Sequence, residues 1–153
     1  MNGDKMETKE LIGKFFESGN IAIVGATDNI EKFGHNVFKE FQQKGFNVFP
    51  VNPNKESIYG VKCYNSINSL PPDVEDAVFV IPPETTTEVV KRVPATGLKR
   101  IWMQQGSESD EAINFCVQNN INVISKKCVL MYAPPVKSFH RLHRAVWKVI
   151  GRL

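Results

Sequence analysis

Ile21-Ala22-Ile23-Val24-Gly25-Ala26-Thr27 is the stretch of sequence that decides the fold. Its first four residues are all apolar, which is typical of a parallel strand buried on both faces, because such strands read as continuous apolar runs. The glycine directly after the run permits a tight turn. The stretch therefore predicts an internal strand of a parallel sheet that leads into a loop at residues 25–34.

Outward from this strand, β-branched runs alternate with amphipathic segments, the pattern of a parallel sheet covered by helices. Strands are predicted at residues 21–24, 46–51, 77–81, 100–103 and 121–124, and helices within residues 1–19 and at 34–44, 84–93, 108–119 and 137–153. Ser107 or Ser109 is the expected N-cap of the helix at 108–119. Residues 52–75 are predicted as a structured loop with one short helix near Ile67.

Five parallel strands joined by right-handed crossovers make one doubly wound α/β domain over residues 1–153, with helices on both faces of the sheet. The expected strand order is 3-2-1-4-5. A chain of 153 residues with 42% hydrophobic and 23% charged residues excludes a disordered protein. Its apolar runs are far shorter than the ~20 residues that span a bilayer, so no membrane span is predicted.

Charge and cysteine content narrow the function classes further. The mixed charges of residues 1–10 do not have the layout of a secretory signal, so a cytoplasmic protein is expected. Cys63, Cys116 and Cys128 stand in no metal-ligand spacing and are expected to be reduced thiols. His140 and His143 lack accompanying ligands, so no metal site is predicted. The net charge of +3 is too small to indicate nucleic acid binding by itself.

The loop after the first strand is the leading candidate for a binding site, because ligands of doubly wound sheets bind beside the carboxyl end of that strand. Gly25 allows the turn, and the helix that begins near Gly34 offers free N–H groups to an anion. Ala26 and Thr27 replace the second glycine of a dinucleotide fingerprint and its neighbour. A phosphate-binding loop is predicted, and a plain strand-to-helix turn remains the alternative.

The end of the second strand indicates which nucleotide is bound. Dehydrogenases place Asp or Glu there to bind the ribose hydroxyls, whereas residues 51–55 read Val-Asn-Pro-Asn-Lys. This difference argues against a nicotinamide cofactor. Lys55, together with Lys32, is predicted to hold a phosphate on the ribose, and the alternative for Lys55 is a solvated surface lysine.

Residues after the third and fourth strands supply further candidates. Pro82 and Pro83 form a rigid rim that suits an adenine ring or a pantetheine arm, although a helix start explains them equally. Gln104 and Gly106 could hydrogen-bond a ligand. The predicted helix at 137–153 carries a basic stripe opposite an apolar one, which fits a helix that covers the sheet with its charges in water, or a surface for nucleic acid or an anionic membrane.

These marks together resemble the CoA-binding domain family, the stand-alone form of the Rossmann-like domain at the start of the succinyl-CoA synthetase α subunit. The resemblance covers residues 20–132. It is carried, in order, by Ile23 to Thr27 with Lys32 and Gly34, Val51-Asn52-Pro53, Tyr59-Gly60 with Tyr64 and Ser66, Ile81-Pro82-Pro83, Trp102 with Gln104 and Gly106, and Cys128.

The resemblance implies that the chain binds coenzyme A or an acyl-CoA. The phosphorylated histidine of the synthetase lies in a second domain and this chain ends after the first, so binding without catalysis is expected. The expected binding residues are Gly25, Ala26, Thr27, Lys32, Phe33, Gly34, Val51, Asn52, Pro53, Lys55, Ile81, Pro82, Thr85, Gln104 and Gly106.

Two other functions remain open at this stage. One is an NAD(P)-dependent oxidoreductase, and the other is a synthetase-like subunit that needs a partner chain. Self-association or an unidentified protein partner is also compatible with the sequence, whereas nucleic acid is the less favoured partner.

Overall fold

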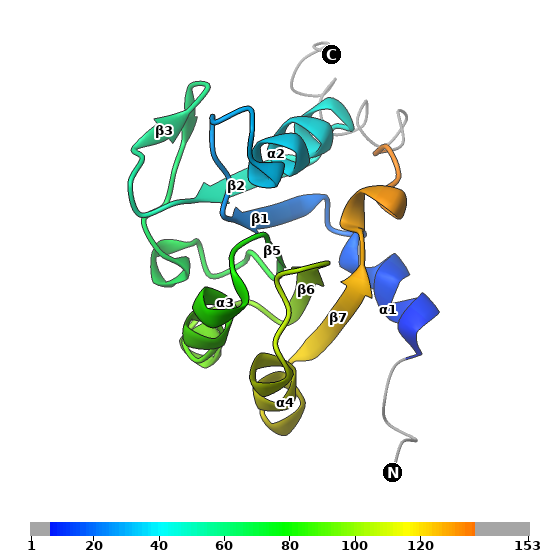
Figure 1. Ribbon diagram of the computed structural model, residues 1–153. Coiled ribbons are helices and arrows are strands. Elements are labelled where there is room, and N and C mark those ends of the chain that lie inside the picture. Colours follow the sequence, from blue (N-terminus) through cyan, green and yellow to red (C-terminus); the bar gives the residue numbers. More distant parts are fainter. Residues whose placement is uncertain (1–6, 137–153) are drawn as a thin grey trace.

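A five-stranded parallel sheet forms the centre of this protein, for which a computed structural model describes residues 7–136 (Figure 1). Its strands are β1 (Asn20–Val24), β2 (Asn47–Val51), β5 (Asp76–Phe79), β6 (Arg100–Gln104) and β7 (Asn122–Lys127). The helices are α1 (Thr8–Phe15), α2 (Phe33–Gln43), α3 (Pro83–Val90) and α4 (Asp110–Gln118). All five strands and the first four helices predicted from the sequence are therefore present.

The order of the strands is β2-β1-β5-β6-β7, which corrects the predicted pairing in one respect. The third predicted strand, β5, pairs with β1 and not with β2. The place beside β2 belongs to the short segment at Tyr64, which forms an isolated parallel bridge with Val51. If the segment at Tyr64 is counted as the third strand, the order read from that edge of the sheet is 3-2-1-4, with β5 as the fourth strand. In either description the strand order reverses beside β1.

Residues 52–75 contain more structure than the predicted loop. A two-stranded hairpin, β3 (Ser57–Ile58) and β4 (Val61–Lys62), turns through Tyr59 and Gly60, whose φ angles are 50° and 80°. The predicted short helix is the 3-10 turn η2 (Ile67–Ser69). Periodicity could not reveal the hairpin because each of its strands has only two residues.

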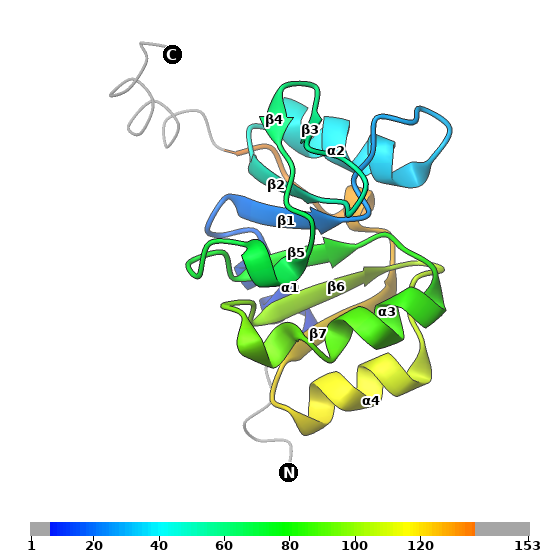
Figure 2. The same ribbon diagram turned by 90° about the vertical axis from the view of Figure 1, so that its left-hand side faces the viewer.

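Helices cover both faces of the sheet, as predicted (Figure 2). On one face, α1 and α2 bury Phe15, Phe38 and Phe41 against Ile21 and Trp102. On the other face, α3 and α4 pack on a second cluster that includes Phe79, Ile101, Met103 and Cys116. Each fully buried side chain of this size contributes roughly 1.5 to 3 kcal/mol relative to exposure. The fold class, a single doubly wound Rossmann-like domain, is confirmed.

Local sequence features explain where two of the helices begin or end. Ser109 is the N-cap of α4, since its hydroxyl accepts the N–H of Ala112 at 3.0 Å. Ser107 instead accepts the N–H of Ile81 at 3.2 Å. The third helix stops at Val90, shorter than predicted, and a 3-10 turn, η3 (Val93–Ala95), follows around Pro94.

The predicted basic helix at 137–153 lies outside the described residues. Within residues 7–136, none of the helices has the length and apolar character needed to cross a membrane.

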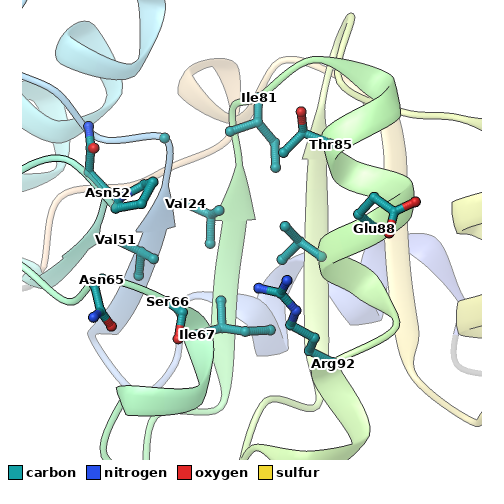
Figure 3. Close-up of a pocket in the computed structure, with 13 residues that line it drawn as sticks. Val24, Val51, Asn52, Asn65, Ser66, Ile67, Ile81, Thr85, Glu88 and Arg92 are labelled. Carbon is teal, nitrogen blue, oxygen red and sulfur yellow. The ribbon is translucent and has the colours of Figure 1, made fainter.

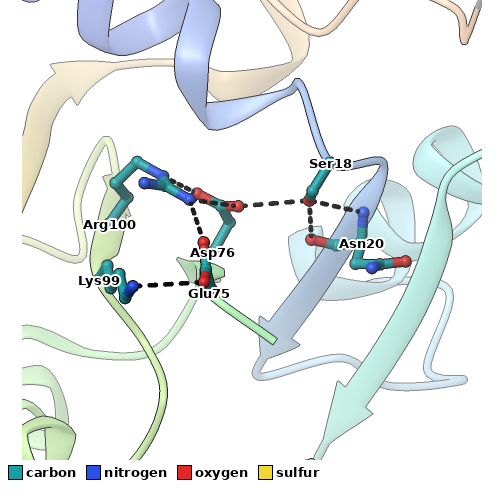
Figure 4. Close-up of polar contacts among 6 residues, drawn as sticks. All are labelled: Ser18, Asn20, Glu75, Asp76, Lys99 and Arg100. Atoms are coloured by element: carbon teal, nitrogen blue, oxygen red, sulfur yellow. Dashed lines mark hydrogen bonds and ion pairs between the residues drawn. The ribbon is translucent and has the colours of Figure 1, made fainter. Parts of the chain in front are cut away.

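A buried ion pair joins β5 to β6 (Figure 4). Asp76 is fully buried and accepts hydrogen bonds from the Nε and Nη2 atoms of Arg100, its cross-strand partner. Burial raises the pKa of the Asp76 carboxyl, because the loss of water outweighs its bonds to Arg100. The Arg100 guanidinium also donates to Glu75 at 3.0 Å and holds the pKa of that carboxyl below its usual range.

We expect Arg100→Met to reduce the free energy of unfolding by about 3 to 5 kcal/mol, because it leaves the Asp76 carboxylate buried without its partner. Lys99→Met is the matched control. It removes only an exposed contact with Glu75 at 3.4 Å and should cost less than about 1 kcal/mol. Urea denaturation of both variants measures the difference.

The loss in Arg100→Met should also depend on pH. Arg100 lowers the pKa that burial raises at Asp76, so without it the folded-state pKa lies further above the unfolded value and the variant loses more stability as pH rises through that interval. The deficit should therefore be largest at neutral pH and shrink toward about pH 4, the ordinary pKa of an aspartate. Equal losses in the two variants at neutral pH would contradict this role for the pair.

Candidate functional site

A cavity of about 500 Å³ opens beside the carboxyl ends of β1 and β2, between the sheet and α3 (Figure 3). This volume is typical of small-molecule sites. Its lining includes both aliphatic and polar side chains. The lining residues are Val24, Gly25, Val51, Asn52, Pro53, Asn65, Ser66, Ile67, Ile81, Thr85, Glu88, Val89 and Arg92. The cavity lies where the sheet order reverses, the position that the sequence predicted for a ligand crevice.

Gly25 lines this cavity, and Gly34 lies against Gly25 at the start of α2. Gly25 has φ 104° and donates its N–H to Val51 at 3.0 Å, and a Cβ there would overlap the carbonyl of Val80. A Cβ on Gly34 would overlap the Gly25 carbonyl oxygen. The first turn of α2 therefore approaches the end of β1 more closely than any residue with a side chain would allow.

The N-terminus of α2 is available to an anion. Lys32 is its N-cap residue but forms no capping hydrogen bond through its side chain, and the first turn contains no acidic residue. Thr27 and Asn29 stabilise the preceding loop internally, since their side-chain oxygens accept the N–H groups of Asn29 and Glu31. The positive end of the helix dipole thus stays uncompensated by a carboxylate of its own first turn.

Asn52 holds the end of β2 against this loop. Its Nδ2 atom donates to the Ala26 carbonyl at 2.9 Å, and its Oδ1 atom accepts the N–H of Asn54 at 2.8 Å. Nearby, Lys55 forms an ion pair with Asp28 at 3.1 Å and does not line the cavity. Burial raises the pKa of the Cys63 thiol, which donates to the Asn52 carbonyl at 3.7 Å.

The cavity brings together only part of the predicted set: Gly25, Val51, Asn52, Pro53, Ile81 and Thr85. Ala26, Thr27, Lys32, Phe33 and Gly34 lie in the adjoining loop and the first turn of α2. Pro82 is the N-cap residue of α3.

Gln104 and Gly106 lie apart from the cavity lining. The Oε1 atom of Gln104, a buried side chain, accepts the N–H of Val129 at 2.9 Å. The N–H of Gly106 donates to Glu108. The part that these outlying residues take in binding stays a prediction.

Sequence reasoning missed half of the cavity lining. Glu88 and Val89 follow the predicted Thr85 at i+3 and i+4 on α3, the spacing of residues on one side of a helix, and Arg92 lies two residues beyond the end of α3. Asn65, Ser66 and Ile67 carry no such signal. They reach the cavity because the chain returns to the edge of β2 at Tyr64.

His35 and Cys116, two other residues with reactive side chains, do not line the cavity. His35 is within hydrogen-bond distance of the Tyr59 hydroxyl, with its Nε2 atom at 3.0 Å. Burial raises the pKa of the Cys116 thiol to about 12. Over residues 7–136, no cluster of three or more His, Cys, Asp or Glu side chains is arranged to hold a metal ion, and His140 and His143 fall outside that range.

Comparison with known proteins gives a consistent set of relatives. A family model described as a CoA binding domain matches residues 19–134. The α subunit of an ADP-forming acetate–CoA ligase II from Pyrococcus furiosus is 27% identical over an alignment of 130 positions, which covers 78% of this chain and 28% of the subunit. Uncharacterized protein YneT of Bacillus subtilis is 28% identical over 84% of this chain and 93% of its own length.

Solved structures show the same two kinds of relative. A conserved hypothetical protein from Pyrococcus furiosus has 40% identity and a TM-score of 0.71, over 73% of this chain and 97% of its own. A dinucleotide-forming acetyl-coenzyme A synthetase 1 from Ca. Korarchaeum cryptofilum has 25% identity and a TM-score of 0.62, over 69% of this chain and 25% of its own. The chain thus spans about a quarter of these ligase and synthetase relatives and nearly the full length of the smaller proteins.

Gly34→Ala should destabilise the protein by about 1 to 3 kcal/mol, because the added methyl group forces the start of α2 away from the Gly25 carbonyl. Gly13→Ala is the control. Gly13 lies in α1 with open space where a Cβ would be, so an alanine there should stabilise the protein by about 0.5 to 1 kcal/mol. Thermal denaturation compares the two. A neutral Gly34→Ala would show that α2 moves away at no cost.

Proposed function

Because the chain belongs to the CoA-binding domain family, we propose that it binds coenzyme A or an acyl-CoA in the cavity beside β1 and does not itself transform the ligand. The observation that carries this proposal is the family match over residues 19–134, which contains every residue of the cavity lining. The relatives named above as acetate–CoA ligase and acetyl-CoA synthetase support the same class of ligand.

The chemistry of the cavity fits a nucleotide that carries phosphates. In the proposed pose, the pyrophosphate lies against the turn at Gly25 and the free N-terminus of α2, where backbone N–H groups and the helix dipole favour negative charge. The loop residues Ala26, Thr27, Lys32, Phe33 and Gly34 surround that position. The nucleoside then lies over the aliphatic walls near Val51, Pro53 and Ile81. Gln104 and Gly106 remain candidates for the far end of the ligand.

A role in binding without catalysis is supported by the smaller relatives. YneT and the hypothetical protein from Pyrococcus furiosus match this chain over 93% and 97% of their own lengths, so the domain occurs in proteins that contain little else. The ligase relatives include much additional chain. A subunit that acts together with such a chain is the second candidate, and it would use the same CoA site.

The end of β2 argues against a nicotinamide dinucleotide. Asn52, Pro53, Asn54 and Lys55 occupy the place where dehydrogenases present a carboxylate to the ribose hydroxyls. Calorimetric titration with CoA, acetyl-CoA, NAD, NADP and ATP tests the assignment. We expect CoA and acetyl-CoA to bind more tightly than the other three. Tighter binding of NAD than of CoA would overturn the proposed function.

Lys55 is the proposed partner of the phosphate on the CoA ribose. Its present partner is Asp28, and both side chains are about two-fifths exposed. An exposed ion pair of this kind contributes only about 0 to 1 kcal/mol. Lys55 can therefore exchange the carboxylate for a phosphate, which carries more charge, at little cost.

Dephospho-CoA should accordingly bind about ten- to a hundredfold more weakly than CoA, equivalent to ~1.5 to 3 kcal/mol, and the gap should narrow as salt is added. Lys55→Ala should remove most of that gap. Asp28→Asn should widen it by freeing the lysine. Calorimetry at low and moderate salt measures all three proteins. Equal binding of CoA and dephospho-CoA to the unmodified protein would mean that the ribose phosphate points into solvent.

A further inference from the structure

Arg92 is the one positively charged side chain among the described residues that line the cavity. It follows the end of α3, seven residues after Thr85, and its guanidinium points into the cavity toward Ile67 (Figure 3). Glu88, the only acidic residue of the lining, directs its carboxylate away from the cavity in the same view. At the Arg92 end of the cavity, the guanidinium is therefore a hydrogen-bond donor without a carboxylate of the lining directed at it.

The guanidinium of Arg92 has no partner within the described part of the chain. The ion pairs found there involve Lys44, Lys55, Lys91, Lys99 and Arg100, and Arg92 takes part in hydrogen bonds only through its backbone. The neighbouring Lys91 provides a direct contrast, because it pairs with Glu111 at 3.5 Å on the outer side of α3. An unpaired guanidinium beside aliphatic walls is available for a ligand.

The surroundings of Arg92 favour a flat ring over a phosphate. Val24, Val51 and Ile67 are almost fully buried and form an aliphatic wall of the cavity, and Val89 of α3 also lines it. Such walls match the faces of an aromatic heterocycle. The groups suited to phosphate stand at the other end, at the Gly25 turn and the start of α2. Thr85 lies in the first turn of α3 and Arg92 lies two residues after its last residue, Val90, so the two are at opposite ends of this helix.

A nucleotide can lie between the Gly25 turn and Arg92 in one orientation only, because its base and its 5′-phosphate are on opposite sides of the ribose. With the phosphates at Gly25, the base is directed along α3 toward Arg92. Adenine offers acceptor nitrogens on its edges, and arginine offers only donors. We propose that Arg92 binds the base in this site by donating to a ring nitrogen of the CoA adenine. This inference rests on the proposed function and adds to it the residue that recognises the base.

Arg92→Met tests the inference, with Lys91→Met as the matched control that removes a positive charge from the same helix end outside the cavity. Calorimetric titration with CoA, dephospho-CoA and adenosine 3′,5′-bisphosphate is the measurement. Arg92→Met should weaken all three ligands about ten- to a hundredfold, with the ratio between CoA and dephospho-CoA unchanged. Lys91→Met should leave all three affinities as they are.

The alternatives are separable in the same experiment. A loss for CoA that is absent for dephospho-CoA would assign Arg92 to the ribose phosphate and overturn its role at the base. Unchanged affinities in Arg92→Met, in a protein that binds CoA, would also overturn that role while the proposed function stands. If the unmodified protein does not bind CoA at all, the proposed function fails, and the inference fails with it.

Discussion

The close approach of α2 to the end of β1 is the constraint on which the rest of the site depends. It exists because Gly25 turns the chain at φ 104° and Gly34 brings a helix against the Gly25 carbonyl without an intervening side chain. The contact places the first turn of α2 beside the carboxyl end of β1. It also leaves the Gly25 N–H bonded to Val51, so β1, β2 and α2 meet at one point.

The cavity that opens from this point has two chemically different ends. Backbone N–H groups, Lys32 and Lys55 stand near the turn, where water has access and charges are screened. Farther along α3 the walls become aliphatic, and a single guanidinium faces them. A ligand with charge at one end and a flat apolar ring at the other would satisfy both. In the proposed function, the cavity would take only the nucleotide part of CoA, and the remaining arm would extend outside it.

The buried pair of Asp76 and Arg100 contributes to the fold rather than to this site. It joins the first residues of β5 and β6, at the opposite end of those strands from the cavity. Asp76 and Arg100 therefore satisfy each other at the amino ends of the strands, whereas Arg92, beside the cavity, has no ion-pair partner within residues 7–136.

The sequence by itself determined the strands, the covering helices and the turn at Gly25, because burial on both faces requires uninterrupted apolar runs and the turn requires a residue without a side chain. It also placed Val51, Asn52, Pro53 and Ile81 at the carboxyl ends of their strands. Only the tertiary structure decided that β5 lies beside β1, and that the segment at Tyr64 lies beside β2. Pairing between strands depends on contacts between residues far apart in the chain, which local periodicity does not record. The same reason hid Asn65, Ser66 and Arg92, since each becomes part of a cavity only when segments distant in sequence close around it.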